Sequence, residues 1–215
     1  LGCDPVALVD QPEEQVLDTT LLDTTLPDTA PLEVVGRIRA ASNATFLARI
    51  GEVSVVYKPV AGEKPLWDFP DGTLAAREVA AYLVSESLGW GVVPRTWLRD
   101  GPLGPGMVQL WQEVDATQSP VDVVPTGDVP QDGVRTVLEG VDHEDTPSLR
   151  RMAVFDAVVN NADRKGGHVL PLPDGRRLGV DHGVTFHVEP KLRTVLWGWL
   201  GESLDDDELA GVERV

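Results

Sequence analysis

The sequence predicts an α+β fold in which an antiparallel β-meander comes first and helices and a hairpin follow. Three observations support this prediction. Apolar and polar residues alternate in three short runs between residues 32 and 59, with turn residues between the runs. An apolar stripe at helical spacing occupies residues 73–88, and a Pro-Asp-Gly turn joins two short apolar runs within residues 169–180. At 215 residues, the chain can form one sizeable domain or two small lobes.

The composition excludes several classes of partner. The formal net charge of −17 disfavours nucleic acid and anionic lipid surfaces, because such a surface repels phosphate groups. No apolar run approaches the roughly 18 residues that a membrane-spanning helix needs, so we expect no stable membrane association. The single cysteine excludes an internal disulfide framework and is typical of a reducing cytoplasm, which is the expected location.

The order of the patterns predicts four segments. Residues 1–31 form a flexible tail rich in Thr and Asp, with an imperfect Leu-Asp-Thr-Thr-Leu repeat. Residues 32–114 form a first lobe of three strands, the helix at 73–88 and two further strands at 92–98 and 106–114. Residues 115–147 are rich in Pro, Gly and Asp and are expected to be a linker or insertion. Residues 148–215 form a small second lobe with a helix into residue 160, the hairpin and a short helix near residue 205.

The residues with the clearest chemistry lie at one end of the hairpin. Asp163 precedes the first hairpin strand, His168 opens it, and Asp181 follows the return strand. Because neighbouring strand ends lie together, we expect His168 and Asp181 to be close. Two carboxylates and an imidazole suit one or two divalent cations and a general base. The plainer alternative is a polar hairpin whose aspartates cap turns.

The string NNADRKGGH, followed by VDHG with its Asp eighteen residues after the first Asp, resembles the catalytic and metal-binding loops of kinases. The resemblance is to phosphatidylinositol 3-/4-kinases and to HipA-type bacterial kinases, and the whole chain is similar to an uncharacterised actinobacterial family related to both. It implies a minimal two-lobed, protein-kinase-like fold that uses ATP with Mg²⁺ or Mn²⁺. Asp163 then matches the catalytic Asp and Asp181 the metal-binding Asp. His168 stands where the pattern has Asn, and His182 where it has Phe.

The same resemblance assigns the basic residues. Lys58 ends an apolar strand, as does the kinase lysine that binds the α- and β-phosphates. Glu78 lies inside the apolar stripe of the helix and needs a partner there, and Lys58 is the expected one. The alternative places Glu78 at the edge of the stripe, in solvent. Arg164 or Lys165 would neutralise charge on the transferred phosphoryl group.

Two further stretches are expected to bind nucleotide. The first hairpin lacks a glycine-rich loop, so its backbone amides and the side chains of Ser42, Asn43 and Thr45 would cover the phosphates. The strand that ends near residue 114 would form the hinge that binds adenine, through Gln112, Glu113 and Val114.

The resulting hypothesis is an ATP-dependent phosphotransferase of atypical kinase type. We expect its acceptor to be a Ser/Thr protein substrate, including the tail threonines Thr19, Thr20, Thr24 and Thr25 of the same chain. A nucleotide-binding pseudokinase that acts as an interaction module is the alternative from another class. A lipid or small-molecule kinase and a nucleotidyl transferase would share the same pocket. A metal hydrolase would leave Lys58 and Glu78 without a role. The sequence gives no oligomeric state.

Overall fold

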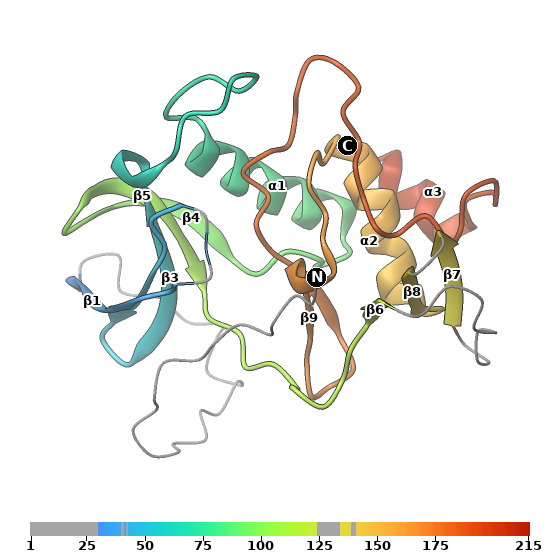
Figure 1. Cartoon of the computed structure of the whole chain (residues 1–215), viewed down its shortest axis with the longest axis horizontal. Helices are drawn as coiled ribbons and strands as arrows, with labels where there is room; N and C mark the ends of the chain where they lie inside the picture. The colour runs from blue at the N-terminus through green and yellow to red at the C-terminus, as the bar shows by residue number, and fades with distance from the viewer. Residues whose placement is uncertain (1–29, 40, 42, 124–133, 139–140) are drawn as a thin grey trace. The chain divides into compact units, whose positions relative to one another are not determined.

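The computed structural model describes residues 30–39, 41, 43–123, 134–138 and 141–215. These residues divide into two compact units. The first contains the described residues up to Ala75 together with Thr96–Trp111, and the second contains Ala76–Arg95 together with the described residues from Gln112 to Val215. The expected α+β class is confirmed, since the described elements are antiparallel strands and a few helices (Figure 1).

The first unit is built on an antiparallel sheet with strand order β1-β2-β3-β5-β4. Its strands are β1 (Leu32–Arg37), β2 (Phe46–Ile50), β3 (Val53–Pro59), β4 (Thr96–Gly101) and β5 (Gly104–Leu110). Most of the helix that lies between the third and fourth strands in the sequence belongs to the second unit. That the sheet forms a nucleotide-binding lobe stays a prediction. The fourth strand begins at Thr96, four residues later than predicted.

The core of this sheet follows the alternation in the sequence. Ala48, Ile50, Val55 and Tyr57 are buried on successive inward positions of β2 and β3, together with Val108 of β5. Alternate residues therefore form one apolar face, which is why the period-two pattern located these strands correctly.

Helix α1 (Leu74–Leu88) confirms the helix predicted at 73–88. Its first turn holds no acidic residue of its own, but the Glu63 carboxylate accepts hydrogen bonds from the backbone N–H groups of Leu74 and Ala75, at 3.2 and 2.8 Å. A negative charge at a helix N-terminus is favourable. The helix ends before Gly89, whose φ of +72° suits glycine at this position.

The second unit contains more strands than the sequence predicts. Residues 115–147, expected to be a linker, contribute β6 (Val121–Val123), β7 (Val134–Leu138) and β8 (Val141–Glu144), which pair antiparallel in the order β6-β8-β7. His143 of β8 is buried, and its ring centroid lies 4.4 Å from that of Trp199. These strands have three to five residues, too few for a sustained sequence period.

Helix α2 (Pro147–Val158) is capped by Thr146, whose side chain accepts the N–H of Leu149. A 3-10 turn (Gly166–His168) then leads into the predicted hairpin of β9 (Val169–Pro171) and β10 (Arg177–Gly179). The short helix near residue 205 is α3 (Asp206–Val212), with a capping box between Asp205 and Glu208. Within the described part of the chain, no helix has the length and apolarity that crossing a membrane would require.

Candidate active site

The hairpin of β9 and β10 brings His168 and Asp181 together, as its strand ends predict. His168 Nε2 lies 3.4 Å from Asp181 Oδ2, and the N–H of Val180 donates to the carbonyl oxygen of His168 over 3.0 Å. The Asp181 side chain is 52% exposed and the His168 side chain 17% exposed. Burial lowers the pKa of the His168 imidazole below its ordinary value, and the Asp181 carboxylate opposes that shift. A neutral imidazole beside an exposed carboxylate is a donor pair that a divalent cation can use.

Asp181 has an unusual backbone conformation. Its φ is +63°, in the left-handed region that Asp enters more readily than most residues, at a cost of about 1–3 kcal/mol when the surroundings impose it. Strain of this kind is concentrated at functional turns, where it aims a side chain. The turn after β10 therefore presents the Asp181 carboxylate to solvent instead of burying it.

Asp163 lies on the loop between α2 and the 3-10 turn. Its backbone N–H donates to Asn161 Oδ1 over 3.0 Å, and its carboxylate pairs with Lys165 Nζ at 2.7 Å. The side chains of Asp163 and Lys165 are 33% and 58% exposed, so both groups can reach a bound molecule. The loop thus fixes the backbone of Asp163 and leaves its carboxylate accessible.

Arg164 is placed differently from the sequence prediction. Its side chain has no exposed surface and forms a bidentate ion pair with Asp156, with Nε–Oδ2 and Nη2–Oδ1 distances of 3.0 and 2.8 Å. Its Nη1 also donates to the carbonyl oxygens of His168 and Val180, each over 3.2 Å. A guanidinium enclosed in this way cannot meet a phosphoryl group, which corrects the prediction that Arg164 neutralises its charge. The same role for Lys165 stays a prediction.

Arg164 and Asp156 belong to a larger buried set of polar side chains. Asp156 also accepts hydrogen bonds from Asn161 Nδ2 and Thr194 Oγ1, over 2.9 and 3.0 Å. Arg164 Nη2 lies 2.6 Å from His182 Nε2, and that nitrogen must accept because a guanidinium only donates. The His182 ring lies edge-on to Phe155, with centroids 5.4 Å apart. His182, at the expected Phe position, therefore combines apolar packing with a polar contact.

Glu78 is 2% exposed, as its place in the apolar stripe predicts. Its carboxylate accepts the backbone N–H of His182 over 2.8 Å, which attaches helix α1 to the turn that carries Asp181. Lys58 belongs to the first unit and Glu78 to the second, and their pairing stays a prediction. The contact with His182 was not foreseen, because it joins residues 104 positions apart.

The segment after Asp181 is attached to the loop that carries Asp163. Ala162 N–H donates to Val184 O over 3.0 Å, and Arg193 N–H donates to Asn161 O over 2.8 Å. Asn160, with a φ of +51°, donates its side-chain amide to the carbonyl oxygens of His187 and Glu189 and accepts the N–H of Lys191. Both asparagines of the NNADR string therefore hold loops together.

The residues predicted to cover the nucleotide phosphates have structural roles where they are described. The Thr45 hydroxyl is buried and donates to Asn43 O, which removes it from the phosphate-covering role that we expected. Asn43 Oδ1 accepts the Lys64 N–H over 2.9 Å. Ser42 and the tail threonines lie outside the described residues. Residues 112–114 follow the division between the two units, and their binding of adenine stays a prediction.

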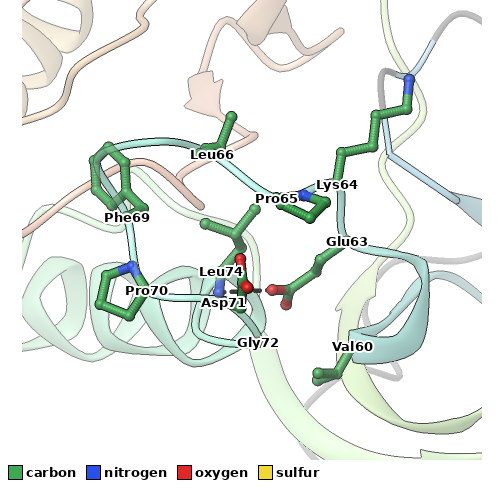
Figure 2. A pocket seen from close by; sticks show the side chains of 10 residues that line it. All are labelled: Val60, Glu63, Lys64, Pro65, Leu66, Phe69, Pro70, Asp71, Gly72 and Leu74. Carbon is green, nitrogen blue, oxygen red and sulfur yellow. Dashed lines mark hydrogen bonds between the residues drawn. The ribbon is translucent and has the colours of Figure 1, made fainter.

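The first unit contains a cavity of about 200 Å³ between the end of β3 and the start of α1 (Figure 2). Figure 2 shows Glu63 turned toward the start of α1, where it caps the helix, and Lys64 turned away from Phe69 and Pro70. None of the predicted site residues lines it; the lining residues are Val60, Glu63, Lys64, Pro65, Leu66, Phe69, Pro70, Asp71, Gly72 and Leu74. We assign it no part in the chemistry of the hairpin.

One feature of the sequence indicates the buried network. Asp156 lies seven residues after Leu149 and four after Met152, on the buried face of helix α2. A carboxylate on such a face requires a partner, and the only arginine in the loop that follows is Arg164. His182 and Thr194 carried no comparable signal, because neither lies in a regular element.

Comparison with known proteins gives one clear relative. The chain is 54% identical over 204 residues to Protein Rv2133c of Mycobacterium tuberculosis, a match that covers 84% of this chain and 73% of the relative. No family model matches the sequence. Among solved structures, the chain is similar to the Helicobacter pylori proinflammatory kinase CtkA, with a TM-score of 0.45 and 14% identity over 77% of this chain. The chain spans 62% of the length of that kinase.

Proposed function

The chain belongs to the family of the mycobacterial protein Rv2133c, and we propose that it is an ATP-dependent phosphotransferase of atypical kinase type. The observation that carries the proposal is the hairpin end, where His168 Nε2 lies 3.4 Å from Asp181 Oδ2. The loop that carries Asp163 is bonded to the segment after this turn. The N–H of Ala162 donates to the carbonyl oxygen of Val184, and the N–H of Arg164 donates to the carbonyl oxygen of Arg193. The relation of the whole chain to phosphatidylinositol 3-/4-kinases and HipA-type kinases is also part of this proposal.

His168 and Asp181 fit a divalent cation, because a neutral imidazole and an exposed carboxylate are both metal ligands. Among the described residues they are not joined by a third His, Cys, Asp or Glu in a ligand cluster. Mg²⁺ in phosphotransfer sites typically takes one or two protein carboxylates and completes its shell with phosphate oxygens and water. When bound, such a cation neutralises charge on the ATP phosphates.

The protein groups have separate roles in this proposal. Asp163 orients or deprotonates the acceptor hydroxyl, and Lys165, paired with it at 2.7 Å, neutralises charge that develops on the phosphoryl oxygens. Lys58 binds the α- and β-phosphates and is held by Glu78. The backbone of residues 112–114 binds adenine.

For the acceptor, we propose a Ser or Thr hydroxyl of a protein, including the tail of this chain. The net charge of −17 disfavours an inositide in an anionic membrane, although the motifs resemble those of lipid kinases. Repeated threonines in an acidic tail favour a protein acceptor.

A pseudokinase is the second candidate, and one observation favours it. His168 replaces the Asn of the kinase pattern, and among the described residues no third His, Cys, Asp or Glu completes a ligand cluster with His168 and Asp181. A chain with this site can bind nucleotide without transferring phosphate.

The decisive experiment is incubation with γ-labelled and, separately, α-labelled ATP, in the presence of Mg²⁺ or Mn²⁺. Asp163→Ala removes the proposed base, and Asp174→Ala is the matched control, since Asp174 lies on the exposed turn of the same hairpin, where its carboxylate pairs with Arg176. Label from γ-ATP that Asp163→Ala loses and Asp174→Ala keeps is the expected result. Label from α-ATP alone indicates nucleotidyl transfer. Binding of ATP with no label from either favours the pseudokinase.

A further inference from the structure

The buried pair of Asp156 and Arg164 joins three segments that each carry part of the proposed site. Arg164 comes from the loop that presents Asp163, and its Nη1 donates to the carbonyl oxygens of His168 and Val180, on the two sides of the hairpin end. Its Nη2 reaches His182, the residue after Asp181. One guanidinium therefore holds the backbone of His168 itself and contacts the residues on both sides of Asp181.

Asp156 fixes that guanidinium from helix α2. Both carboxylate oxygens accept from Arg164, and they also accept from Asn161 and Thr194, so the carboxylate is held by four donor groups besides its own helix. Neither partner has any exposed side-chain surface. A buried pair with this many bonds has one favourable arrangement, since any shift breaks a charge-assisted hydrogen bond in a medium of low dielectric constant.

We propose that Asp156 and Arg164 are positioning residues, which hold the Asp163 loop and the Asp181 turn in one fixed geometry without touching nucleotide, metal or acceptor. The expected effect on catalysis rests on the proposed function, whereas the expected effect on the geometry of the two loops does not. If it is correct, loss of the pair loosens both loops together, because they share the Arg164 contacts.

The chain provides a matched control in a second arginine–carboxylate pair. Arg177 makes a two-pronged contact with Glu144, with distances of 2.9 and 3.0 Å, and its side chain is 8% exposed. This pair joins β10 to β8 and contacts neither Asp163 nor Asp181. Arg177→Lys and Arg164→Lys therefore make the same chemical change, and only the second affects the proposed site.

The experiment measures hydrogen exchange of the full chain, Mn²⁺ affinity by electron paramagnetic resonance, and the rate of ATP turnover. In Arg164→Lys we expect amides of both loops, residues 161–168 and 180–184, to exchange about tenfold faster or more, since local opening governs exchange. We expect the affinity for Mn²⁺ to fall about tenfold and kcat to fall about 10²-fold, with KM for ATP nearly unchanged. The fall in kcat follows because misplacing a catalytic group by about 1 Å lowers the rate about 10²-fold. Arg177→Lys leaves loop exchange, Mn²⁺ affinity and kcat within about twofold of the parent.

Unchanged exchange in both loops of folded Arg164→Lys overturns the inference, and so does the same loosening in Arg177→Lys. Thr194→Val removes one donor to Asp156 and leaves the ion pair intact, so it replaces Arg164→Lys if that variant does not fold, with a smaller change of the same kind expected. If the parent chain transfers no phosphate, the proposed function fails, whereas hydrogen exchange still decides whether the pair positions the loops.

Discussion

Adding one methyl group at Gly179 should disturb the proposed site without altering any group that takes part in the chemistry. A Cβ atom at this position lies 2.9 Å from Arg164 Nη2, 3.0 Å from Nη1 and 3.2 Å from Cζ. Favourable contacts between heavy atoms lie at about 3.5–4.0 Å, so in Gly179→Ala the guanidinium must move by roughly half an ångström. The φ of Gly179 is outside the left-handed region, so the clash alone causes the effect.

The magnitude follows from the burial of Arg164. Inserting a methyl group into a packed interior costs about 1–3 kcal/mol, which urea unfolding of the variant should show. A shift of half an ångström in the guanidinium should lower kcat roughly tenfold, since about 1 Å of misplacement costs about 10²-fold. Steady-state release of ADP measures that rate. Gly36→Ala is the control, because a Cβ atom there meets no atom within 4 Å. Wild-type stability and rate in Gly179→Ala would refute the argument that Arg164 is rigidly held.

Three further predictions concern the metal ligand and the helix ends. His168→Asn replaces an imidazole with a harder oxygen ligand, which suits Mg²⁺ better than the imidazole does. The value of kcat/KM measured with Mg²⁺, divided by the value measured with Mn²⁺, should therefore rise about tenfold. An unchanged ratio argues against His168 as a ligand. Thr146→Ala should lower the free energy of unfolding by about 1 kcal/mol in urea, whereas Ser148→Ala should change it by less than about 0.5 kcal/mol; equal effects would contradict the observed cap of α2. Glu63→Gln should cost about 0.3–1 kcal/mol, because the charge at the start of α1 is lost, and high salt should reduce the difference.

The sequence predicted the elements whose evidence is local. The strands of the meander and helix α1 follow from period-two and helical apolar patterns, and the Pro-Asp-Gly turn fixed the hairpin and hence the approach of His168 to Asp181. The three strands within residues 121–144 were missed because their pairing partners, and not their own patterns, define them.

The role of Arg164 shows why the finer parts of the site could not be predicted. The NNADR string identifies an arginine beside a catalytic aspartate, and both a solvated and a buried side chain agree with that spacing. The choice depends on Asp156, His182 and Thr194, which lie 8, 18 and 30 residues away and meet Arg164 or its partner only in the folded chain. Loop geometry of this kind is set by tertiary contacts, which a residue pattern does not encode.

The energetics of the network indicate what it contributes. A buried arginine–carboxylate pair pays a desolvation cost that its attraction often only balances, so Asp156 and Arg164 add little net stability over apolar side chains of similar volume. An apolar pair makes no directional hydrogen bonds. Each hydrogen bond of Arg164, in contrast, fixes the orientation of a particular carbonyl or imidazole group. The side chains of Asp163 and Asp181 are 33% and 52% exposed, so burial of their own carboxylates does not fix them. We therefore infer that the buried groups on the neighbouring residues set the relative geometry of Asp163 and Asp181, and that the network contributes this geometry more than it contributes stability.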